Sequence, residues 1–147
     1  MPDVKQAIDV TAAIVLRKSE GITEYLLTQR PRGKSNPLYW EFPGGKVHQG
    51  ETEEECLTRE IHEELGVKTL KIHRKFVTAR HDQKDSTIVL HGYLCTFDDA
   101  ENIVLHEHND AHWVPLDKLQ DYKTTGSDAE FIEKLVAEPI EYDSLFE

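Results

Sequence analysis

A dense run of glycines and carboxylates between residues 45 and 67 is the feature that most constrains this chain. It begins at a glycine pair, Gly44 and Gly45, and closes on Gly66, with many glutamates between them. Glycine lets the backbone take a positive φ and approach a neighbouring group closely. The run therefore predicts a loop, a helix and a second loop that together gather acidic side chains in one place.

Local signals predict where the helix of this run begins and ends. Thr52 is a good N-cap, and Glu55 three residues later completes a capping box. The acidic first turn suits the positive end of the helix dipole, and Gly66 is the expected left-handed stop. The sequence therefore predicts a helix from about Glu53 to Leu65.

The helix has one apolar face and one acidic face. At about 100° per residue, the apolar stripe carries Leu57, Ile61 and Leu65. An adjacent arc carries Glu60, Glu63 and Glu64. Carboxylates so close to one another repel, and a bound cation offsets that repulsion. Ligands that are all oxygen favour Mg²⁺ or Mn²⁺ over softer metals.

The loop at residues 42–46 adds a positive charge beside the glycine pair. Lys46 supplies a compact cation that can contact a phosphate group. A helix rich in glutamate is usually no more than a solvated face. That simpler interpretation leaves the glycine pair, the position of Glu51 and the arginine next to Glu60 without an explanation. We therefore favour a cation site that can hold a polyphosphate.

The same residues resemble the Nudix box, which reads Gly, five residues, Glu, seven residues, Arg-Glu, an aliphatic residue, any residue, Glu-Glu, any residue, Gly and an aliphatic residue. Its fixed positions are filled here by Gly45, Glu51, Arg59, Glu60, Ile61, Glu63, Glu64, Gly66 and Val67. The preceding segment 40–44 and the chain length are most similar to the MutT branch, the nucleoside triphosphate pyrophosphohydrolases. The resemblance implies an α/β fold, namely a Nudix-type α/β/α sandwich with a mixed sheet and a loop-helix-loop catalytic motif.

The resemblance also implies a metal site and its ligands. The cofactor would be Mg²⁺, with Mn²⁺ as the alternative. The ligands would be the carbonyl oxygen of Gly44 and the side chains of Glu60, Glu63, Glu64 and Glu107. Glu107 stands six residues before Trp113, as a metal-binding glutamate does in the MutT pattern, although a solvated loop glutamate is the alternative.

Four residues receive catalytic roles from the resemblance. Arg59 would orient a neighbouring glutamate by an ion pair, with Glu51 as its bidentate partner. Glu60 is one candidate for the general base, and Glu107 is the second.

A further set of residues would bind the substrate. Arg30 matches a phosphate-contacting position, or is a surface arginine after a strand, while Gly45 and Lys46 would contact the substrate from the loop. Phe42 is either an aromatic side chain presented to the base or a core residue. Asp128 either reads the base edge or is a simple helix N-terminal acid. A carboxylate accepts hydrogen bonds, which favours a guanine-type base, whereas cytosine would need a protonated aspartate.

Composition bounds the remaining possibilities. The net charge of −11 argues against nucleic acid and membrane surfaces as partners. An anionic nucleotide substrate must then be neutralised by metal ions and a few local basic residues. We expect residues 1–147 to form a single domain, a monomer or a homodimer, with no membrane span or targeting signal.

The cysteines and a histidine cluster add little chemistry. Cys56 and Cys95 have no metal or redox spacing, and free thiols of this kind predict a cytoplasmic protein. The histidines near Glu107 fit no compact zinc pattern, and we assign no metal to them; they are His106, His108 and His112.

The rest of the chain predicts strands and one more helix. We expect strands at residues 10–16, 25–29, 68–80, 87–97, 102–105 and 111–114, and a short helical turn at 116–121. Ser127 and Glu130 predict a second capping box, for a helix that ends near Ala137 before Pro139.

The leading functional hypothesis is Mg²⁺-dependent hydrolysis of a nucleoside triphosphate, such as 8-oxo-dGTP or another dNTP, to the monophosphate and pyrophosphate. Coenzyme A is an alternative substrate, because residues 26–30 resemble the start of a coenzyme A diphosphatase signature, although residues 31–34 depart from it. ADP-ribose and diadenosine polyphosphates are further alternatives. A nucleotide-binding module without turnover is the third hypothesis, and the intact box argues against it.

Overall fold

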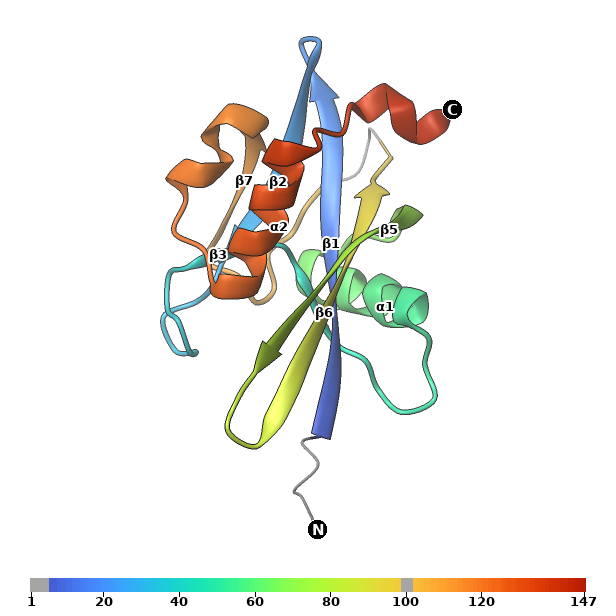
Figure 1. Ribbon diagram of the computed structural model, residues 1–147. Helices are drawn as coiled ribbons and strands as arrows, with labels where there is room; N and C mark the ends of the chain where they lie inside the picture. Colours follow the sequence, from blue (N-terminus) through green and yellow to red (C-terminus); the bar gives the residue numbers. More distant parts are fainter. Residues whose placement is uncertain (1–5, 99–101) are drawn as a thin grey trace.

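A twisted seven-stranded sheet forms the middle of the computed structural model, which describes residues 6–98 and 102–147 (Figure 1). The strands are β1 (Gln6–Ser19), β2 (Ile22–Gln29), β3 (Trp40–Glu41), β4 (Gly44–Lys46), β5 (Lys71–Asp82), β6 (Ser86–Thr96) and β7 (Asp110–Pro115). Their order is β3-β2-β1-β6-β5, with β4 paired to β1 and β7 paired to β2. The sheet is mixed, because β1 and β6 are parallel and the other pairs are antiparallel.

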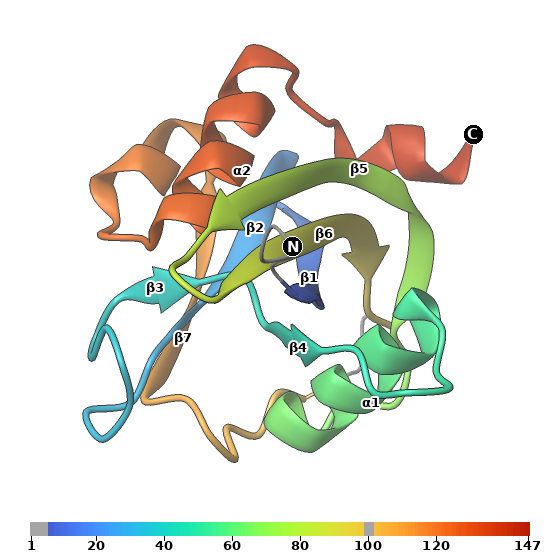
Figure 2. The same ribbon diagram turned by 60° about the horizontal axis from the view of Figure 1, so that its bottom comes forward.

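Helices cover both faces of this sheet. They are α1 (Glu53–Leu65), α2 (Gly126–Ala137) and two short 3₁₀ helices, η1 (Leu116–Asp121) and η2 (Tyr142–Phe146). Figure 2 shows α1 and α2 on opposite sides of the strands. The expected α/β/α sandwich with a mixed sheet is therefore confirmed, and η1 corresponds to the expected helical turn.

β1 supplies apolar side chains to both layers, because successive residues of a strand point to opposite faces. One face packs in the cluster that contains Phe131 of α2, and its β1 members are Ala12, Ile14 and Leu16. The other face packs in the cluster that contains Leu57 of α1, and its β1 members are Ala13 and Val15. This double burial explains why the strand reads as an unbroken apolar run.

The two ends of α1 are capped as the sequence predicts. The Thr52 hydroxyl accepts a hydrogen bond from the Glu55 N–H, and the Glu55 carboxylate accepts one from the Thr52 N–H. Gly66 has φ 68°, and its N–H donates to the carbonyl of His62. The predicted apolar stripe of α1 is fully buried.

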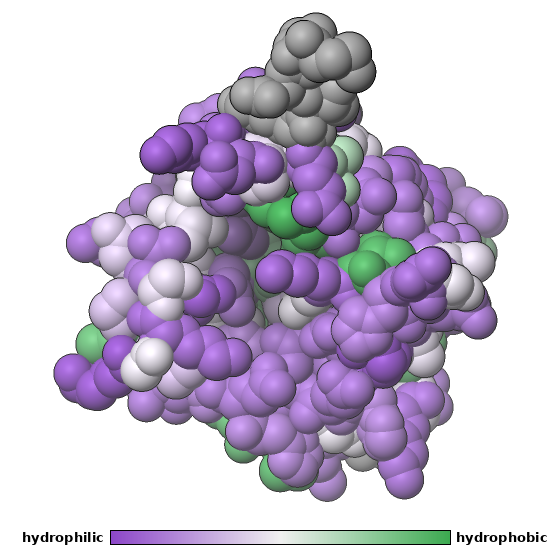
Figure 3. Space-filling model, turned by 90° about the horizontal axis from the view of Figure 1, so that it is seen from below, coloured by the Kyte–Doolittle hydropathy of each residue, from purple (hydrophilic) through white to green (hydrophobic). Residues whose placement is uncertain are grey.

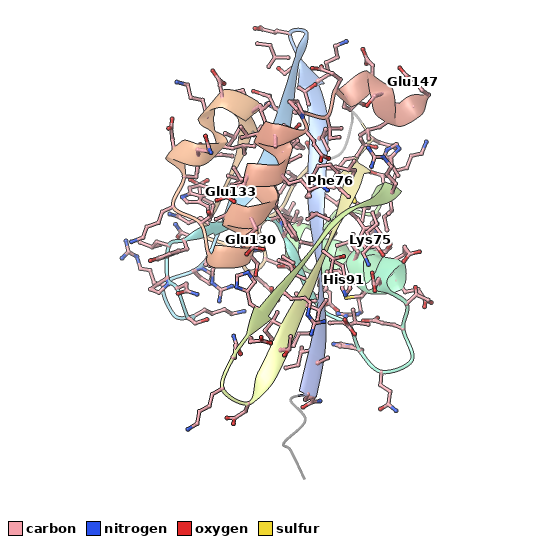
Figure 4. The ribbon with its side chains drawn as sticks, viewed as in Figure 1. Lys75, Phe76, His91, Glu130, Glu133 and Glu147 are labelled. Carbon is pink, nitrogen blue, oxygen red and sulfur yellow. The ribbon has the colours of Figure 1, made fainter. Side chains whose placement is uncertain are left out.

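The first turn of α1 is also tied to the sheet. The Glu53 carboxylate accepts hydrogen bonds from the Tyr93 hydroxyl at 2.6 Å and from Lys75 Nζ at 3.1 Å. His91 Nδ1 lies 3.5 Å from the same oxygen. Figure 4 shows Lys75 and His91 close to α1. These contacts hold the helix that carries the acidic arc in a fixed place on the strands.

Two predictions about secondary structure were wrong. Residues 102–105 form no strand, because the N–H groups of Val104 and His106 donate instead to the last carbonyls of α1, those of Leu65 and Glu64. The second capping box is absent. α2 begins one residue before Ser127, its N-cap is Thr125, and no side chain caps it.

Two short strands, β3 and β4, were not predicted from the sequence. β3 and β4 have two and three residues, too few to show a periodic pattern. They exist because β2 and β1 offer unpaired backbone groups to them. Their pairing places the segment 40–46 across the end of the sheet, next to α1.

Candidate active site

A cavity of about 590 Å³ lies between α1, the start of α2, and the loop at residues 30–36. Figure 3 shows a hollow on the face seen from below, with mainly hydrophilic residues around it. The structure brings together there most of the residues singled out from the sequence, namely Arg30, Phe42, Gly44, Gly45, Lys46, Glu60, Glu63, Glu64, Glu107 and Asp128. Arg59 and Glu51 are not among the residues that line it.

Glu64 lies at the centre of the acidic wall of this cavity. Its residue is 3% exposed, and its Oε2 has no hydrogen-bond partner. Burial, with added repulsion from Glu60, Glu107 and Glu41, raises the pKa of Glu64 to about 9. A buried carboxylate that lacks a partner is costly in free energy. A divalent cation fits this place, because it would complete the coordination of that oxygen and offset the repulsion.

Arg59 stands behind the acidic wall and holds it. Its Nε and Nη2 donate to the two carboxylate oxygens of Glu51, at 3.0 and 2.7 Å, so the expected bidentate ion pair is present. Its Nη1 donates to Glu60 at 2.8 Å and to Glu63 at 3.3 Å. The hydrogen bonds from Arg59 and from the His48 N–H lower the pKa of Glu51 to about 2.

The two loop glycines are needed for space. A Cβ on Gly44 would collide with the backbone of β1 at the Thr11 carbonyl, and a Cβ on Gly45 would collide with the Glu60 carboxylate. Neither uses the positive φ that glycine allows, since the glycines with positive φ are Gly21, Gly50 and Gly66. The absence of a side chain at Gly45 leaves room for the Glu60 carboxylate.

Basic side chains also line the cavity. Arg30 Nη1 donates to Glu41 at 2.9 Å, and its other nitrogens donate to the backbone and hydroxyl of Ser35. Its guanidinium is thus held at the cavity by the loop that follows β2. Lys46 is exposed, and Lys34, to which the sequence analysis gave no role, also lines the cavity.

Phe42 and Asp128 form one connected unit. Phe42 is 3% exposed and packs on Phe131 with ring centroids 6.1 Å apart, so it is a core residue that also lines the cavity. Its N–H donates to Asp128 Oδ1 at 2.9 Å, and the Thr125 hydroxyl donates to Asp128 Oδ2. Burial raises the pKa of Asp128 to about 7. Each carboxylate oxygen retains a further lone pair for a ligand.

Sequence reasoning missed two residues of the acidic wall, Glu41 and His108. His108 Nε2 lies 2.9 Å from Glu41 Oε2 and 3.6 Å from Glu64 Oε1. The position of Glu41 just before the glycine loop was a usable signal. Nothing in the sequence indicated that His108, 67 residues away, would contact Glu41. The exposed His106 and His112 lie outside this group, so the three histidines do not form a cluster.

The two cysteines are packing residues, as expected. Both are buried free thiols. Cys56 Sγ lies 3.3 Å from the Thr11 hydroxyl and from the carbonyl of Lys46, under the glycine loop.

A family model described as the NUDIX domain matches residues 7–135 of the chain. The chain belongs to the Nudix family. The CTP pyrophosphohydrolase of Escherichia coli K12 is 30% identical over 131 residues, which are 88% of this chain and 92% of that protein. The 8-oxo-dGTP diphosphatase of Proteus vulgaris is 33% identical over 92 residues, or 63% of this chain and 79% of that protein.

A solved structure shares the fold of this chain. The E. coli ORF135 protein superposes with a TM-score of 0.75 at 28% identity, over 93% of this chain and 96% of that chain. The expected MutT-like Nudix hydrolase, an enzyme whose relatives carry the names of pyrophosphohydrolases, is therefore confirmed. Among the described residues, no helix is long and apolar enough to cross a membrane.

Proposed function

We propose that this Nudix hydrolase converts a nucleoside triphosphate to the monophosphate and pyrophosphate, with Mg²⁺ as its cofactor. The observation that carries the proposal is Glu64, a buried carboxylate with an unpartnered oxygen, surrounded by three other glutamates in a cavity of nucleotide size. A hydrolase cavity of this composition suits a substrate that arrives with a cation between its phosphates and the protein.

Each residue of the acidic wall receives a role in this proposal. The carbonyl of Gly44 and the carboxylates of Glu60, Glu63, Glu64 and Glu107 would hold the metal. When bound, Mg²⁺ neutralises phosphate charge and lowers the pKa of coordinated water. Arg59, paired with Glu51, keeps Glu60 pointing into the cavity.

The hydrolytic step needs one base and one leaving group. A water oxygen forms a bond to a phosphorus atom while the bond between that phosphorus and the bridging oxygen breaks, which gives the monophosphate and pyrophosphate. The proton of the water passes to a carboxylate, for which Glu60 and Glu107 are the candidates. Both line the cavity beside Glu64.

Arg30 and Lys46 would contact the phosphates. The chain has a net charge of −11, so bulk attraction does not bring an anionic nucleotide to it. Local cations aimed into the cavity are therefore required, and these two side chains line it.

Asp128 is the residue we assign to base selection. In its charged form it accepts hydrogen bonds, as the edge of guanine or 8-oxo-guanine requires. In its protonated form it can also donate one, as cytosine requires. With a pKa of about 7, both forms are present near neutral pH. This observation, with the similarity to a CTP pyrophosphohydrolase, makes cytosine nucleotides the second candidate substrate class.

The test is pyrophosphate release with Mg²⁺ across dGTP, 8-oxo-dGTP, dCTP, CTP, ADP-ribose, diadenosine polyphosphate and coenzyme A. We expect the highest kcat/KM on one of the triphosphates. Hydrolysis of only a diphosphate-linked compound would support the metal-dependent hydrolysis but reject a nucleoside triphosphate as the substrate.

The same panel tests the role of Asp128. Asp128→Asn keeps an oxygen that can accept from the Phe42 N–H and removes the charge. We expect it to change the ratio of kcat/KM between guanine and cytosine nucleotides. An equal change on all triphosphates would remove Asp128 from the base site.

A further inference from the structure

A histidine and two glutamates from three separate segments meet at one wall of the cavity. Glu41 comes from β3, Glu64 from α1, and His108 from the loop before β7. One ligand atom of each residue lies within 4.8 Å of the others. Among the residues that the structure describes, this is the one group of three or more histidine, cysteine or carboxylate side chains whose ligand atoms all lie so close together.

The group is buried and incompletely bonded. The side chains of His108, Glu64 and Glu41 are 3%, 5% and 18% exposed. Glu64 Oε2 and His108 Nδ1 have no hydrogen-bond partner. Buried polar atoms are normally satisfied by a protein group, a water or an ion. Glu64 lines the cavity, so its unpartnered oxygen is available to a bound ion.

The backbone holds His108 in position from both sides. Two residues before it, the N–H of His106 donates to the carbonyl of Glu64 at 3.0 Å. One residue after it, the N–H of Asn109 donates to the carbonyl of Gln29 at 2.9 Å, and the Asn109 side chain donates to the Gln29 side chain at 2.6 Å. The imidazole is thus presented to the two glutamates by a loop anchored to α1 and β2.

We propose that Glu41, Glu64 and His108 form a binding site for a divalent transition-metal ion. Mg²⁺ prefers oxygen ligands and keeps much of its water, whereas an imidazole nitrogen beside carboxylates suits Co²⁺ or Zn²⁺. Glu64 also belongs to the magnesium ligands, so the inference rests on the proposed function for the role of that residue. The site makes the enzyme bind transition ions more tightly than Mg²⁺, and the two kinds of ion compete for Glu64.

A hydrogen bond alone would account for the 2.9 Å contact between His108 and Glu41. Glutamine separates the two explanations. In His108→Gln, the amide N–H can still donate to Glu41, but a neutral amide is a poor ligand for these ions. His106→Gln is the matched control, because its side chain is exposed and lies in the same loop.

The experiment is a calorimetric titration with Co²⁺ alone, without nucleotide, on the whole chain. We expect His108→Gln to bind Co²⁺ at least about tenfold more weakly than the wild-type protein and His106→Gln to bind it normally. Proton NMR of the cobalt-loaded protein should show strongly shifted imidazole resonances that His108→Gln lacks. Equal Co²⁺ affinity in His108→Gln, or shifted resonances that persist in it, would overturn the proposal.

A second variant guards against loss of folding. If circular dichroism shows that His108→Gln is unfolded, Glu41→Gln takes its place, with at least about tenfold weaker Co²⁺ binding as support and unchanged binding as refutation. Failure here is distinct from failure of the proposed function. The cobalt titration involves no turnover, and Mg²⁺-dependent pyrophosphate release is measured separately on the wild-type protein.

Discussion

Gly44 and Gly45 are neighbours in the chain, but a side chain at each would meet a different obstacle. At Gly44 the obstacle is the backbone of β1, which cannot move without separating two paired strands. At Gly45 it is the carboxylate of Glu60, which can move but would leave its place in the acidic wall. One glycine thus serves folding and the other serves the site.

Substituting each glycine by alanine should separate these effects. We expect Gly44→Ala to lower the free energy of unfolding by about 1–3 kcal/mol, as overpacking does. Gly45→Ala should change it by less than about 1 kcal/mol but lower kcat at least about tenfold, because Glu60 is displaced. Urea unfolding and steady-state kinetics measure both, and normal turnover in Gly45→Ala would contradict this account.

The ion pair between Arg59 and Glu51 makes the stability of the protein depend on pH. The pKa of Glu51 falls from 4.5 to about 2 in the folded protein. A group with a lowered pKa stabilises the fold above its unfolded pKa, and that contribution disappears as pH falls through the folded pKa. The Arg59–Glu51 pair should therefore stabilise the protein fully at neutral pH and lose its effect between about pH 4.5 and 2.

Glu51→Gln tests this pH dependence. Between pH 4.5 and 2, the wild-type protein should lose more stability than Glu51→Gln, which has no charge to lose. The measurement is the urea midpoint as a function of pH, with Glu133→Gln on the exposed side of α2 as the control (Figure 4). Parallel profiles for the wild-type protein and Glu51→Gln would show that the ion pair contributes nothing.

At the scale of the element, α1 and α2 start differently. Thr52 and Glu55 form a reciprocal capping box on α1, whereas the N-cap of α2, Thr125, makes no capping bond and its hydroxyl donates to Asp128. Ser127 lies inside the first turn. The start of α2 is therefore organised around Asp128 and the cavity, while the start of α1 is organised for helix stability.

Matched alanine variants test this difference. Thr52→Ala should lower the free energy of unfolding by about 1 kcal/mol, the usual effect of losing an N-cap. Ser127→Ala should change it by less than about 0.5 kcal/mol. Thermal unfolding measures both. A larger loss of stability in Ser127→Ala would support the capping box predicted from the sequence.

The α1 segment was predictable because its signals are local. Thr52, Glu55 and Gly66 act on backbone groups within a few residues, and the stripe of Leu57 and Ile61 follows from helical spacing. β3 and β4 were missed because they exist only through pairing with distant strands. The contact between Glu41 and His108 joins parts of the chain that no local pattern connects.

The candidate site, too, was predictable only in part. The spacing of the box placed Glu60, Glu63 and Glu64 on one arc, and all three line the cavity. That spacing could not show which of these glutamates is buried. Glu64 is buried, whereas the side chain of Glu63 is 51% exposed, because the helix packs on the sheet with Glu64 turned inward. The acidic wall therefore has a buried centre that only the packed helix reveals.

At the scale of the whole molecule, negative charge is the dominant electrostatic fact. The net charge is −11, and the carboxylates of Glu60, Glu107 and Glu41 repel that of Glu64. An ion that binds only the folded state stabilises it by mass action. Divalent cations should therefore act on this protein as stabilisers as well as cofactors.

Thermal unfolding with and without Mg²⁺ tests that coupling. At a Mg²⁺ concentration of about 100 times its Kd, the gain should be about 2.7 kcal/mol. NaCl at matched ionic strength controls for screening and should give a smaller shift. Glu60→Gln should reduce the Mg²⁺ effect, and an equal response to both salts would argue against a specific site.

The most direct test of the central claim is the kcat of Glu63→Gln for pyrophosphate release with Mg²⁺. Glu63 is half exposed, so its substitution should leave the fold and the melting temperature nearly unchanged. The account predicts a fall in kcat of at least about 100-fold, because a metal ligand is lost. A folded Glu63→Gln protein with near-normal kcat would contradict the assignment of the acidic arc as the metal site.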